Sequence, residues 1–326
     1  MKFSLIENAT YRMEETEKPK IGQGENLIKV KACGVCGSDI PRVFYGKAYH
    51  YPLVVGHEFS GVIEDSYDKS KIGKKVCVFP IKPCFNCGNC SEQNYANCKS
   101  YDYYGSRCDG GMQDYVVCKD FNIIELPPEM SYCAAAMTEP CAVCLHAVKK
   151  ANLNEHSVLR VYGAGTIGLL CCMWARAKGV QQVSVFDIDG EKLAFAEKLG
   201  FKANDYQNPD VVIDASGAMS AVSGAIKEIK PFGTLVLLGN ASGDMCFTQE
   251  TYGLILRKQI TVKGSWNSDF KDTENDWKDA VKAISAGVIN PELLITHVFQ
   301  LKDACKAFDM IKSKREIFNK VMVEMQ

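Results

Sequence analysis

Apolar and polar positions alternate in short runs over the first 140 residues, and glycine or proline ends most of these runs. The segments NLIKVKACG, GVIEDS and KKVCVFP show a period of two, which is typical of strands that bury one face. We therefore expect residues 1–140 to form an irregular, mostly β domain. Near the carboxyl end, a helical pattern in DTENDWKDAVKAISAG and a strand-like KVMVEM favour the return of residues 267–326 to this first domain.

The pattern changes from Val158 onward. An apolar strand, a glycine turn and an amphipathic helix follow one another in SVLRVYGAGTIGLLCCMWARAKG, and strand and helix alternate again in QVSVFDIDGEKLAFAEKLG. Three further short strands are expected in DVVIDASG, TLVLLGN and ITVKGSW. This alternation predicts a doubly wound parallel sheet over residues 141–266 and places the chain in the α/β class.

The third and fourth expected strands lie unusually close together in the sequence. Only a few residues separate FKAND from DVVIDAS, whereas a parallel crossover takes a dozen or more residues and usually includes a helix. We therefore expect the crossover helix to be missing here and the third strand to be short.

Composition narrows the range of partners. The 326 residues suffice for two domains, and the formal net charge of −1 gives no electrostatic reason to expect nucleic acid or an anionic membrane as a partner. The amino terminus turns polar after six residues and no apolar run is long enough to span a bilayer. These features predict a cytoplasmic protein without a signal peptide or a membrane anchor.

The chain contains 16 cysteines, and disulfides are not expected because the cytosol keeps thiols reduced. Most of the cysteines lie in apolar segments, where a thiol behaves as a small buried hydrophobe. Examples are Cys77, Cys118, Cys171, Cys172 and Cys246.

Four other cysteines lie in a polar loop, PCFNCGNCSEQNYANC, which has no apolar periodicity. Four thiolates on a compact turn suit tetrahedral Zn²⁺, and with every position filled by sulfur no place remains for water or substrate. We therefore predict a structural zinc held by Cys84, Cys87, Cys90 and Cys98. A zinc-ribbon interaction module is the alternative, but it calls for a basic, aromatic surface that the near-neutral charge argues against.

The glycine turn GAGTIG follows an expected strand and opens an expected helix, which is the context of a dinucleotide site. The first glycine makes the turn, the second lets the backbone approach a pyrophosphate, and the third lets the helix pack on the strand. The candidate cofactor-binding residues here are Gly163, Gly165, Thr166, Ile167 and Gly168.

Asp187 ends the next expected strand, roughly twenty residues further on, where an acidic side chain binds the ribose 2′-hydroxyl. A carboxylate there repels a 2′-phosphate, so the sequence favours NAD over NADP. Asp189 is the fallback for this role, and Lys192 is a candidate neighbour of the adenosine ribose.

Two upstream motifs, CGVCGSD and VVGHEFSG, contain Cys36, His57 and Glu58. These residues supply the ligand atoms of a catalytic zinc, which takes three protein ligands and keeps one position open. Taken singly, each also has a structural interpretation as a core thiol, a loop histidine or a surface acid.

Together these segments resemble the zinc-containing medium-chain dehydrogenase/reductase superfamily over essentially the whole chain. The resemblance rests on GVCGSD, GHEFSG, the four-cysteine loop, TEPCAVCLHAV and GAGTIG, in this order. It implies a GroES-like catalytic domain, a Rossmann coenzyme domain and an active site between them. It also implies a homodimer formed through the coenzyme domains, with the segment ITVKGSW near the dimer interface.

The resemblance also implies roles for individual residues. Cys36 and His57 would bind the catalytic zinc with Glu139 as third ligand, as in the polyol-dehydrogenase branch, which gives two zinc ions per chain. Glu58 would bind the zinc or lie beside it, and Cys141 is a rival third ligand.

The resemblance also implies a route for the proton. Ser38 would accept the alcohol proton. Pro41 stands where many members have a histidine, so the relay would end on water, ribose or Glu58.

Within this branch, GSDIPRVF, YHYPLVVGHEFSG, YDYYGSRCDGG and LILRKQITVKGSW look most like the galactitol-1-phosphate 5-dehydrogenase family, which oxidises galactitol 1-phosphate to tagatose 6-phosphate with NAD⁺. Sorbitol, other polyol and L-threonine dehydrogenases are the alternatives. A non-enzymatic nucleotide sensor is a further alternative, although such a protein should lack one of the catalytic ligands.

The phosphate group of a sugar alcohol phosphate needs a cation to bind it. The candidates for this role are Arg42, Lys47, His50 and Arg107.

Overall fold

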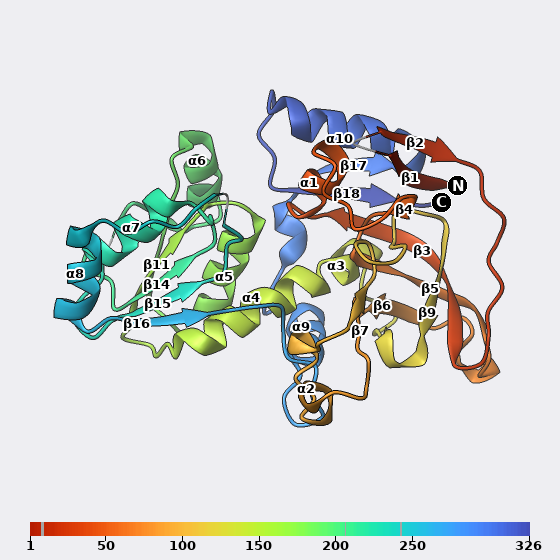
Figure 1. Ribbon diagram of the computed structural model, residues 1–326, viewed down its shortest axis with the longest axis horizontal. Coiled ribbons are helices and arrows are strands. Elements are labelled where there is room, and N and C mark those ends of the chain that lie inside the picture. Colours follow the sequence, from red (N-terminus) through yellow and green to blue (C-terminus); the bar gives the residue numbers. More distant parts are fainter. Residues whose placement is uncertain (8–9, 206, 242) are drawn as a thin grey trace. The chain divides into compact units, whose positions relative to one another are not determined.

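The computed structural model describes residues 1–7, 10–205, 207–241 and 243–326, and the chain forms two compact units (Figure 1). The first unit comprises Met1–Glu139 and Asp269–Gln326, and the second comprises Pro140–Ser268. Both chain termini therefore belong to the first unit. Among the described residues, no helix is both long enough and apolar enough to cross a membrane.

A seven-stranded sheet is the main element of the first unit. Its strands follow the order β10–β6–β5–β3–β18–β17, and β9 pairs with β3. Their bounds are β3 Glu25–Val35, β5 Glu58–Ser66, β6 Lys75–Val78, β9 Tyr115–Lys119, β10 Ile123–Glu125, β17 Ile295–Gln300 and β18 Lys320–Glu324. Strand β18 pairs antiparallel with β3, with Val321 opposite Val35, so the carboxyl-terminal strand lies in the sheet of the first unit.

Smaller elements complete this unit. Two further sheets have the orders β2–β1–β4 and β7–β8. Their strands are β1 Lys2–Glu7, β2 Thr10–Glu14, β4 Leu53–Val54, β7 Ile81–Lys82 and β8 Asp102–Tyr103. The helices are α1 Asp39–Phe44, α2 Gly88–Ser91, α3 Tyr132–Ala136, α9 Asp276–Ser285 and α10 Ala304–Ser313. The helix α4 (Thr138–Ala151) begins at the end of the first segment of this unit.

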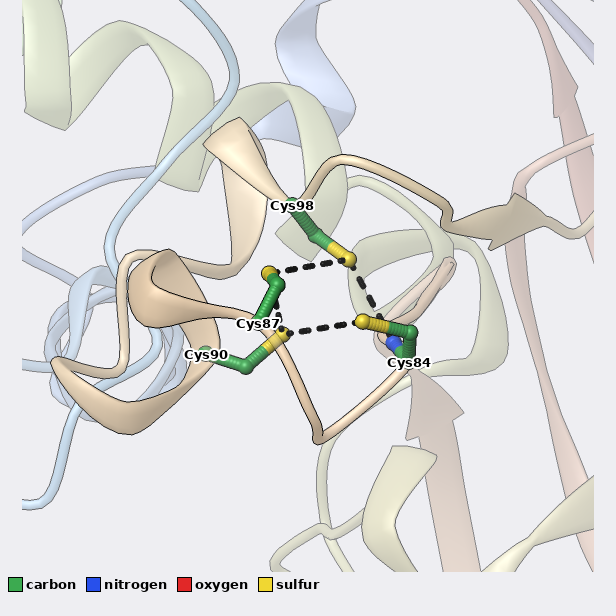
Figure 2. Close-up of side chains that lie close together, drawn as sticks. All are labelled: Cys84, Cys87, Cys90 and Cys98. Atoms are coloured by element: carbon green, nitrogen blue, oxygen red, sulfur yellow. Dashed lines mark hydrogen bonds between the residues drawn. The ribbon is translucent and has the colours of Figure 1, made fainter.

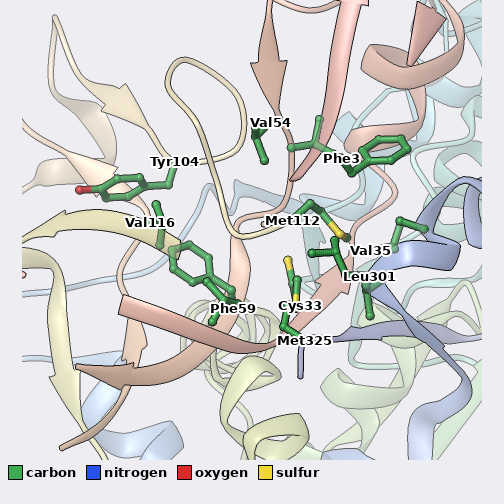
Figure 3. Packing of buried hydrophobic residues seen from close by; sticks show 14 of the residues in the cluster. Phe3, Cys33, Val35, Val54, Phe59, Tyr104, Met112, Val116, Leu301 and Met325 are labelled. Atoms are coloured by element: carbon green, nitrogen blue, oxygen red, sulfur yellow. The ribbon is translucent and has the colours of Figure 1, made fainter. Parts of the chain in front are cut away.

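The core of the first unit joins segments that are far apart in the sequence (Figure 3). Phe3 on β1 stacks on Phe308 of α10 with ring centroids 4.8 Å apart, and both side chains are fully buried. Burying one such side chain contributes roughly 1.5–3 kcal/mol. The core therefore ties the two ends of the chain together.

The second unit contains a six-stranded sheet with all strands parallel, in the order β13–β12–β11–β14–β15–β16. The strands are β11 Val158–Tyr162, β12 Gln182–Phe186, β13 Lys202–Ala203, β14 Val211–Asp214, β15 Thr234–Leu237 and β16 Thr261–Gly264. The helices are α5 Thr166–Ala177, α6 Gly190–Lys198, α7 Met219–Glu228 and α8 Gln249–Lys258. This strand order is that of the Rossmann fold, so the predicted doubly wound sheet is confirmed.

The third strand of this sheet behaves as its short connection predicts. Strand β13 has only two residues, and the described residues between it and β14 form no helix. Both parts of the expectation, a missing crossover helix and a short strand, are confirmed.

All 16 cysteines carry free thiols. Cys77, Cys118, Cys171 and Cys172 are buried, as predicted. The prediction is wrong for Cys246, which is exposed. The physical reason is that residues 243–248 form neither helix nor strand and are exposed along their whole length, so the apolar residues around Cys246 join no core.

Candidate metal centres and dinucleotide site

The four cysteines of the polar loop gather around one point. Figure 2 shows their sulfur atoms turned toward one another, and all four Sγ atoms lie within 4.8 Å of each other. The Sγ atom of Cys90 is 3.9 Å from that of Cys84 and 3.6 Å from that of Cys87, while Cys87 and Cys98 are 4.0 Å apart. Four sulfurs bound tetrahedrally at about 2.3 Å from Zn²⁺ are about 3.8 Å apart. The cluster therefore fits one tetrahedral zinc ion.

Backbone N–H groups favour the thiolate form of Cys87 in this loop, whereas burial raises the pKa of Cys90. The N–H of Cys84 donates to Sγ of Cys98 at 3.3 Å. The N–H groups of Lys99 and Cys90 lower the pKa of Cys87 to about 6. Because a metal binds the thiolate and not the thiol, these donors prepare the loop for an ion.

Replacing Cys90 with serine is expected to remove one bound metal ion per chain and to lower the melting temperature by several degrees. The loop is also held by Gln93, which exchanges two hydrogen bonds with Asp272. Loss of the ion should therefore loosen the loop without unfolding the sheets. Metal analysis, thermal unfolding and hydrogen exchange over residues 84–98 test this prediction. Serine at the exposed Cys246 is the control, and unchanged metal content in Cys90→Ser would contradict the prediction.

A second group of ligand atoms is formed by Cys36, His57 and Glu58, whose candidate donor atoms all lie within 4.8 Å of one another. The pairing of β3 with β5 explains this proximity. In the register of these antiparallel strands, Gly34 is opposite Glu58. Cys36, just beyond the end of β3, is thereby brought to the start of β5, where His57 and Glu58 are buried.

Asp39 supports this group from the first turn of α1. Its fully buried carboxylate accepts the N–H of Cys36 at 3.1 Å and lies 3.7 Å from Nδ1 of His57 and 3.3 Å from Arg42. Burial raises the pKa of Asp39, while His57 and Arg42 counteract this rise. A carboxylate next to a ligand histidine orients its ring. The motif GSD was recognised in the sequence, but this role of its aspartate was not.

Lys320, the first residue of β18, is a further member of the site that the sequence analysis missed. Its Nζ lies 2.5 Å from Oε2 of Glu58 and 3.1 Å from the carbonyl oxygen of Val35, and both charged side chains are buried. Burial alone lowers the pKa of Lys320, but the charges of Glu58 and Cys36 outweigh it and raise this pKa. The available signal was a single lysine directly before three apolar residues of a strand.

Glu139 is buried beside this group but lies outside the set of three whose donor atoms are mutually within 4.8 Å. Burial raises the pKa of Glu139 to about 8, and His57 opposes the rise. The hydroxyl of Tyr103 donates to its Oε1 at 3.4 Å. The rival ligand Cys141 is buried in the second unit, where its carbonyl oxygen accepts the indole N–H of Trp174.

The chemistry of this donor set fits a divalent cation. Burial, with the nearby charges of Glu58 and Asp39, raises the pKa of Cys36 to about 11. Nδ1 of His57 is buried and has no hydrogen-bond partner among the described residues. Three buried carboxylates and a thiol face two cationic side chains, Lys320 and Arg42, so a bound metal would supply the missing positive charge. Sulfur, nitrogen and oxygen donors together suit zinc.

Ser38 lies directly beside this group. Its hydroxyl donates to Sγ of Cys36 at 3.3 Å and accepts from Arg42 at 3.3 Å. Although Ser38 is the residue before α1, its side chain makes no capping hydrogen bond. Pro41, at the position of the absent histidine, lies within α1, and its carbonyl oxygen accepts the N–H groups of Tyr45 and Lys47 at the end of this helix.

The glycine turn joins β11 to α5. Gly163 has φ of +103°, and a Cβ at Gly168 would lie 1.8 Å from the carbonyl oxygen of Gly163, so both positions require glycine. Helix α5 begins at Thr166, which is followed by Ile167. Gly165 precedes this helix, and a Cβ added at Gly165 would meet no atom within 4 Å. This leaves room for a phosphate at the helix N-terminus.

Asp187 lies at the glycine turn. Its carboxylate accepts the N–H of Ala164 at 2.7 Å and that of Asp189 at 3.0 Å. Asp189, the fallback candidate, caps α6 by accepting the N–H groups of Glu191 and Lys192. The side chain of Asp189 therefore serves the helix, and Asp187 is the acid placed at the turn.

The four basic candidates for phosphate binding have different surroundings. Arg42 is ion-paired with Asp39 and donates to the carbonyl oxygen of Ser38 at 2.7 Å. Lys47 and His50 are exposed. Arg107 is half-buried.

A Rossmann sheet together with a mostly β unit that carries a half-buried thiol beside a buried imidazole and carboxylate defines a class, the metal-dependent dehydrogenases that use a dinucleotide. Residues 22–128 match the alcohol dehydrogenase GroES-like domain, and residues 166–286 match the zinc-binding dehydrogenase family. The chain belongs to the zinc-binding, medium-chain alcohol dehydrogenase family. It is a zinc-dependent alcohol or polyol dehydrogenase that binds NAD(P).

Two relatives and one solved structure illustrate this membership. Galactitol 1-phosphate 5-dehydrogenase of Escherichia coli K12 is 36% identical over 307 residues, covering 88% of this chain and 89% of the relative. A crystal structure of galactitol-1-phosphate dehydrogenase from Escherichia coli has a TM-score of 0.91 at 33% identity, covering 99% and 100% of the two chains. D-xylulose reductase A of Aspergillus oryzae is 31% identical over 335 residues, covering 94% and 92%.

Proposed function

We propose that the enzyme oxidises a secondary hydroxyl of a sugar alcohol phosphate with NAD⁺, converting galactitol 1-phosphate to tagatose 6-phosphate. The observation that carries the chemistry is the close group of Cys36, His57 and Glu58 with the hydroxyl of Ser38 beside it. The relative that acts on galactitol 1-phosphate supports the choice of substrate. Two zinc ions per chain complete the proposal, one at this group and one at the four cysteines.

Each residue of the group has a task in this proposal. Cys36 and His57 would hold the catalytic metal with a carboxylate from Glu139 or Glu58. The metal supplies a Lewis acid that lowers the pKa of an alcohol, and NAD⁺ supplies the hydride acceptor. Asp39 holds the backbone of Cys36 by a hydrogen bond and places a carboxylate 3.7 Å from Nδ1 of His57.

The proton of the alcohol passes to the hydroxyl of Ser38, which gives up its own proton in turn. Arg42, which already donates to this hydroxyl, carries no acceptor and cannot take the proton. Since Ser38 is only half-buried and Pro41 offers no side-chain acceptor, the proton leaves through water, the cofactor ribose or Glu58.

The decisive experiment measures NADH formation with galactitol 1-phosphate, tagatose 6-phosphate in the reverse direction, free galactitol, sorbitol, xylitol and L-threonine. The proposal requires kcat/KM to be highest for the phosphate ester. A preference for an unphosphorylated polyol would favour the second candidate, a polyol dehydrogenase without a phosphate site. The similarity to D-xylulose reductase A is the observation that supports this second candidate.

Asp187 should set the preference for NAD⁺. Replacing it with serine is expected to raise KM for NAD⁺ by about 10- to 100-fold, because hydrogen bonds to a charged group contribute about 1.5–3 kcal/mol. Loss of the carboxylate also removes the repulsion of a 2′-phosphate, so activity with NADP⁺ should rise. Steady-state kinetics with both cofactors measure this shift. Glu191→Gln removes a nearby exposed charge as a control, and an unchanged cofactor ratio in Asp187→Ser would reject the assignment.

A homodimer formed through the second unit is also part of the proposal. Strand β16 is the last strand of its sheet, and Val262 on it is 45% exposed. Tyr252 and Leu256 on α8 are exposed as well. An exposed edge strand is a template for pairing with a second chain. Light scattering should give the mass of a dimer for the wild type and that of a monomer for Val262→Lys, whereas a dimeric variant would locate the interface elsewhere.

A further inference from the structure

Arg107 has an environment unlike that of any other basic residue near the metal group. Its guanidinium carbon lies 4.6 Å from the ring centre of Tyr49 and 4.6 Å from that of Tyr101. The side chain is half-buried. Two tyrosine rings thus lie within cation–π distance of one guanidinium, and both contacts restrict where this cation can move.

The stacking leaves the hydrogen-bonding edge of Arg107 available. The guanidinium N–H groups make no hydrogen bond or ion pair with any residue that the structure describes. The backbone of Arg107 is satisfied separately: its N–H donates to the carbonyl oxygen of Tyr103 at 2.9 Å, and its carbonyl oxygen lies 3.1 Å from Nε2 of His50. Aromatic rings cover the face of a guanidinium, whereas its five N–H donors point outward in its plane. A half-buried arginine with unused donors is suited to a doubly charged, oxygen-rich anion.

A line of aromatic rings connects this arginine to the metal group. The ring of Tyr101 lies 6.3 Å from that of Tyr103, whose ring in turn lies 5.6 Å from the imidazole of His57. The hydroxyl of Tyr103 also contacts Glu139. Arg107 is therefore placed two tyrosines away from the proposed ligands, on the same short segment 101–107. One short segment thus carries both the arginine and the tyrosine that contacts the proposed ligands.

The other basic candidates lack one or more of these properties. Arg42 is already used by Asp39 and by two oxygen atoms of Ser38. Lys47 is exposed, and among the described residues no ring or acidic partner fixes its position. His50 is exposed and its Nε2 faces the carbonyl oxygen of Arg107.

We propose that Arg107, held between Tyr49 and Tyr101, binds the phosphate of the substrate and selects phosphate monoesters of polyols over free polyols. This inference rests on the proposed function, since it names the residue that makes the same site specific for a phosphate ester. Arg107 is a binding residue in this proposal and takes no part in the hydride or proton steps.

The test compares the wild type with Arg107→Met, Arg107→Lys and Lys47→Met. The ratio of kcat/KM for galactitol 1-phosphate to that for galactitol should fall about 10- to 100-fold in Arg107→Met, because a bidentate, charge-assisted contact is lost. Arg107→Lys should keep part of the ratio, since it retains the charge but loses the planar fork. Lys47→Met is the matched control, because it removes a neighbouring exposed charge, and its ratio should stay within about twofold of the wild type.

A binding measurement separates the two proposals. Inorganic phosphate should inhibit the wild type competitively with the ester and bind in calorimetry, and Arg107→Met should bind it at least about tenfold more weakly. If the wild type prefers the ester and Arg107→Met keeps both this preference and phosphate binding, the assignment of Arg107 is overturned while the proposed function stands. If the ratio falls in Lys47→Met instead, the role belongs to that lysine. If the wild type turns over no phosphate ester and binds no phosphate, both proposals fail.

Discussion

Replacing Cys36 with serine is expected to lower kcat/KM by at least about 10³-fold and to reduce the metal content from two ions per chain to one. A change at a residue that only supports a metal ligand typically costs 10- to 100-fold in affinity or activity, and loss of a ligand itself should cost more. The thiolate is also the softest donor of the group, so its removal weakens zinc binding most. The four-cysteine site is separate in sequence and should keep its ion.

The measurements are metal analysis by mass spectrometry, steady-state kinetics and thermal unfolding of the same preparations. Cys246→Ser is the matched control, because this thiol is exposed and belongs to neither group. It should retain two ions and full activity. Full activity together with two ions in Cys36→Ser would show that the reaction does not depend on this group. A misfolded variant would instead lose both ions and its cooperative thermal transition.

The two metal groups show why one was easier to predict than the other. Cys84, Cys87, Cys90 and Cys98 lie within fifteen residues, so a loop of any shape keeps them close and the spacing alone indicates a metal. Cys36 and His57 are twenty-one positions apart, and only the antiparallel register of β3 and β5 brings them together. The sequence contains the donors but not this register, and the family resemblance supplied what periodicity did not.

Residues that act on the ligands were harder to predict than the ligands themselves. Lys320 lies 262 positions from Glu58, and the two meet because β18 pairs with β3 next to β5. No local sequence pattern predicts such a contact. Asp39 was visible in GSD, but its hydrogen bond from Cys36 and its position 3.7 Å from Nδ1 of His57 depend on how α1 follows the end of β3. Non-local pairing therefore limits what sequence reasoning can assign.

Local rules succeeded where the chain itself imposes a constraint. The connection between β13 and β14 is too short to hold a helix. The number of residues between the two strands was therefore enough to predict both the missing helix and the short third strand. The glycine turn is constrained in the same way, since Gly163 and Gly168 occupy positions that exclude a side chain. Cys246 shows the limit of such rules, because neighbouring apolar residues do not guarantee burial where no element forms.

The buried pair of Lys320 and Glu58 leads to the last prediction. Lys320→Met should reduce the free energy of unfolding of the metal-free protein by about 3–5 kcal/mol, because removal of one partner leaves a buried charge without compensation. Both side chains are almost inaccessible, at 4% and 1% exposure, so solvent cannot take over the role of the lysine. The double variant Lys320→Met, Glu58→Gln should recover most of the loss, since the remaining group is neutral.

Denaturant unfolding of the wild type, both single variants and the double variant gives the coupling between the two residues. The same cycle with zinc bound should show a smaller loss for Lys320→Met, because the ion then offers Glu58 a second positive partner. Equal losses of unfolding free energy with and without zinc would mean that Glu58 does not interact with the ion. The third ligand would then have to be Glu139. A double variant no more stable than Lys320→Met would show that the lysine acts through the carbonyl oxygen of Val35 and not through Glu58.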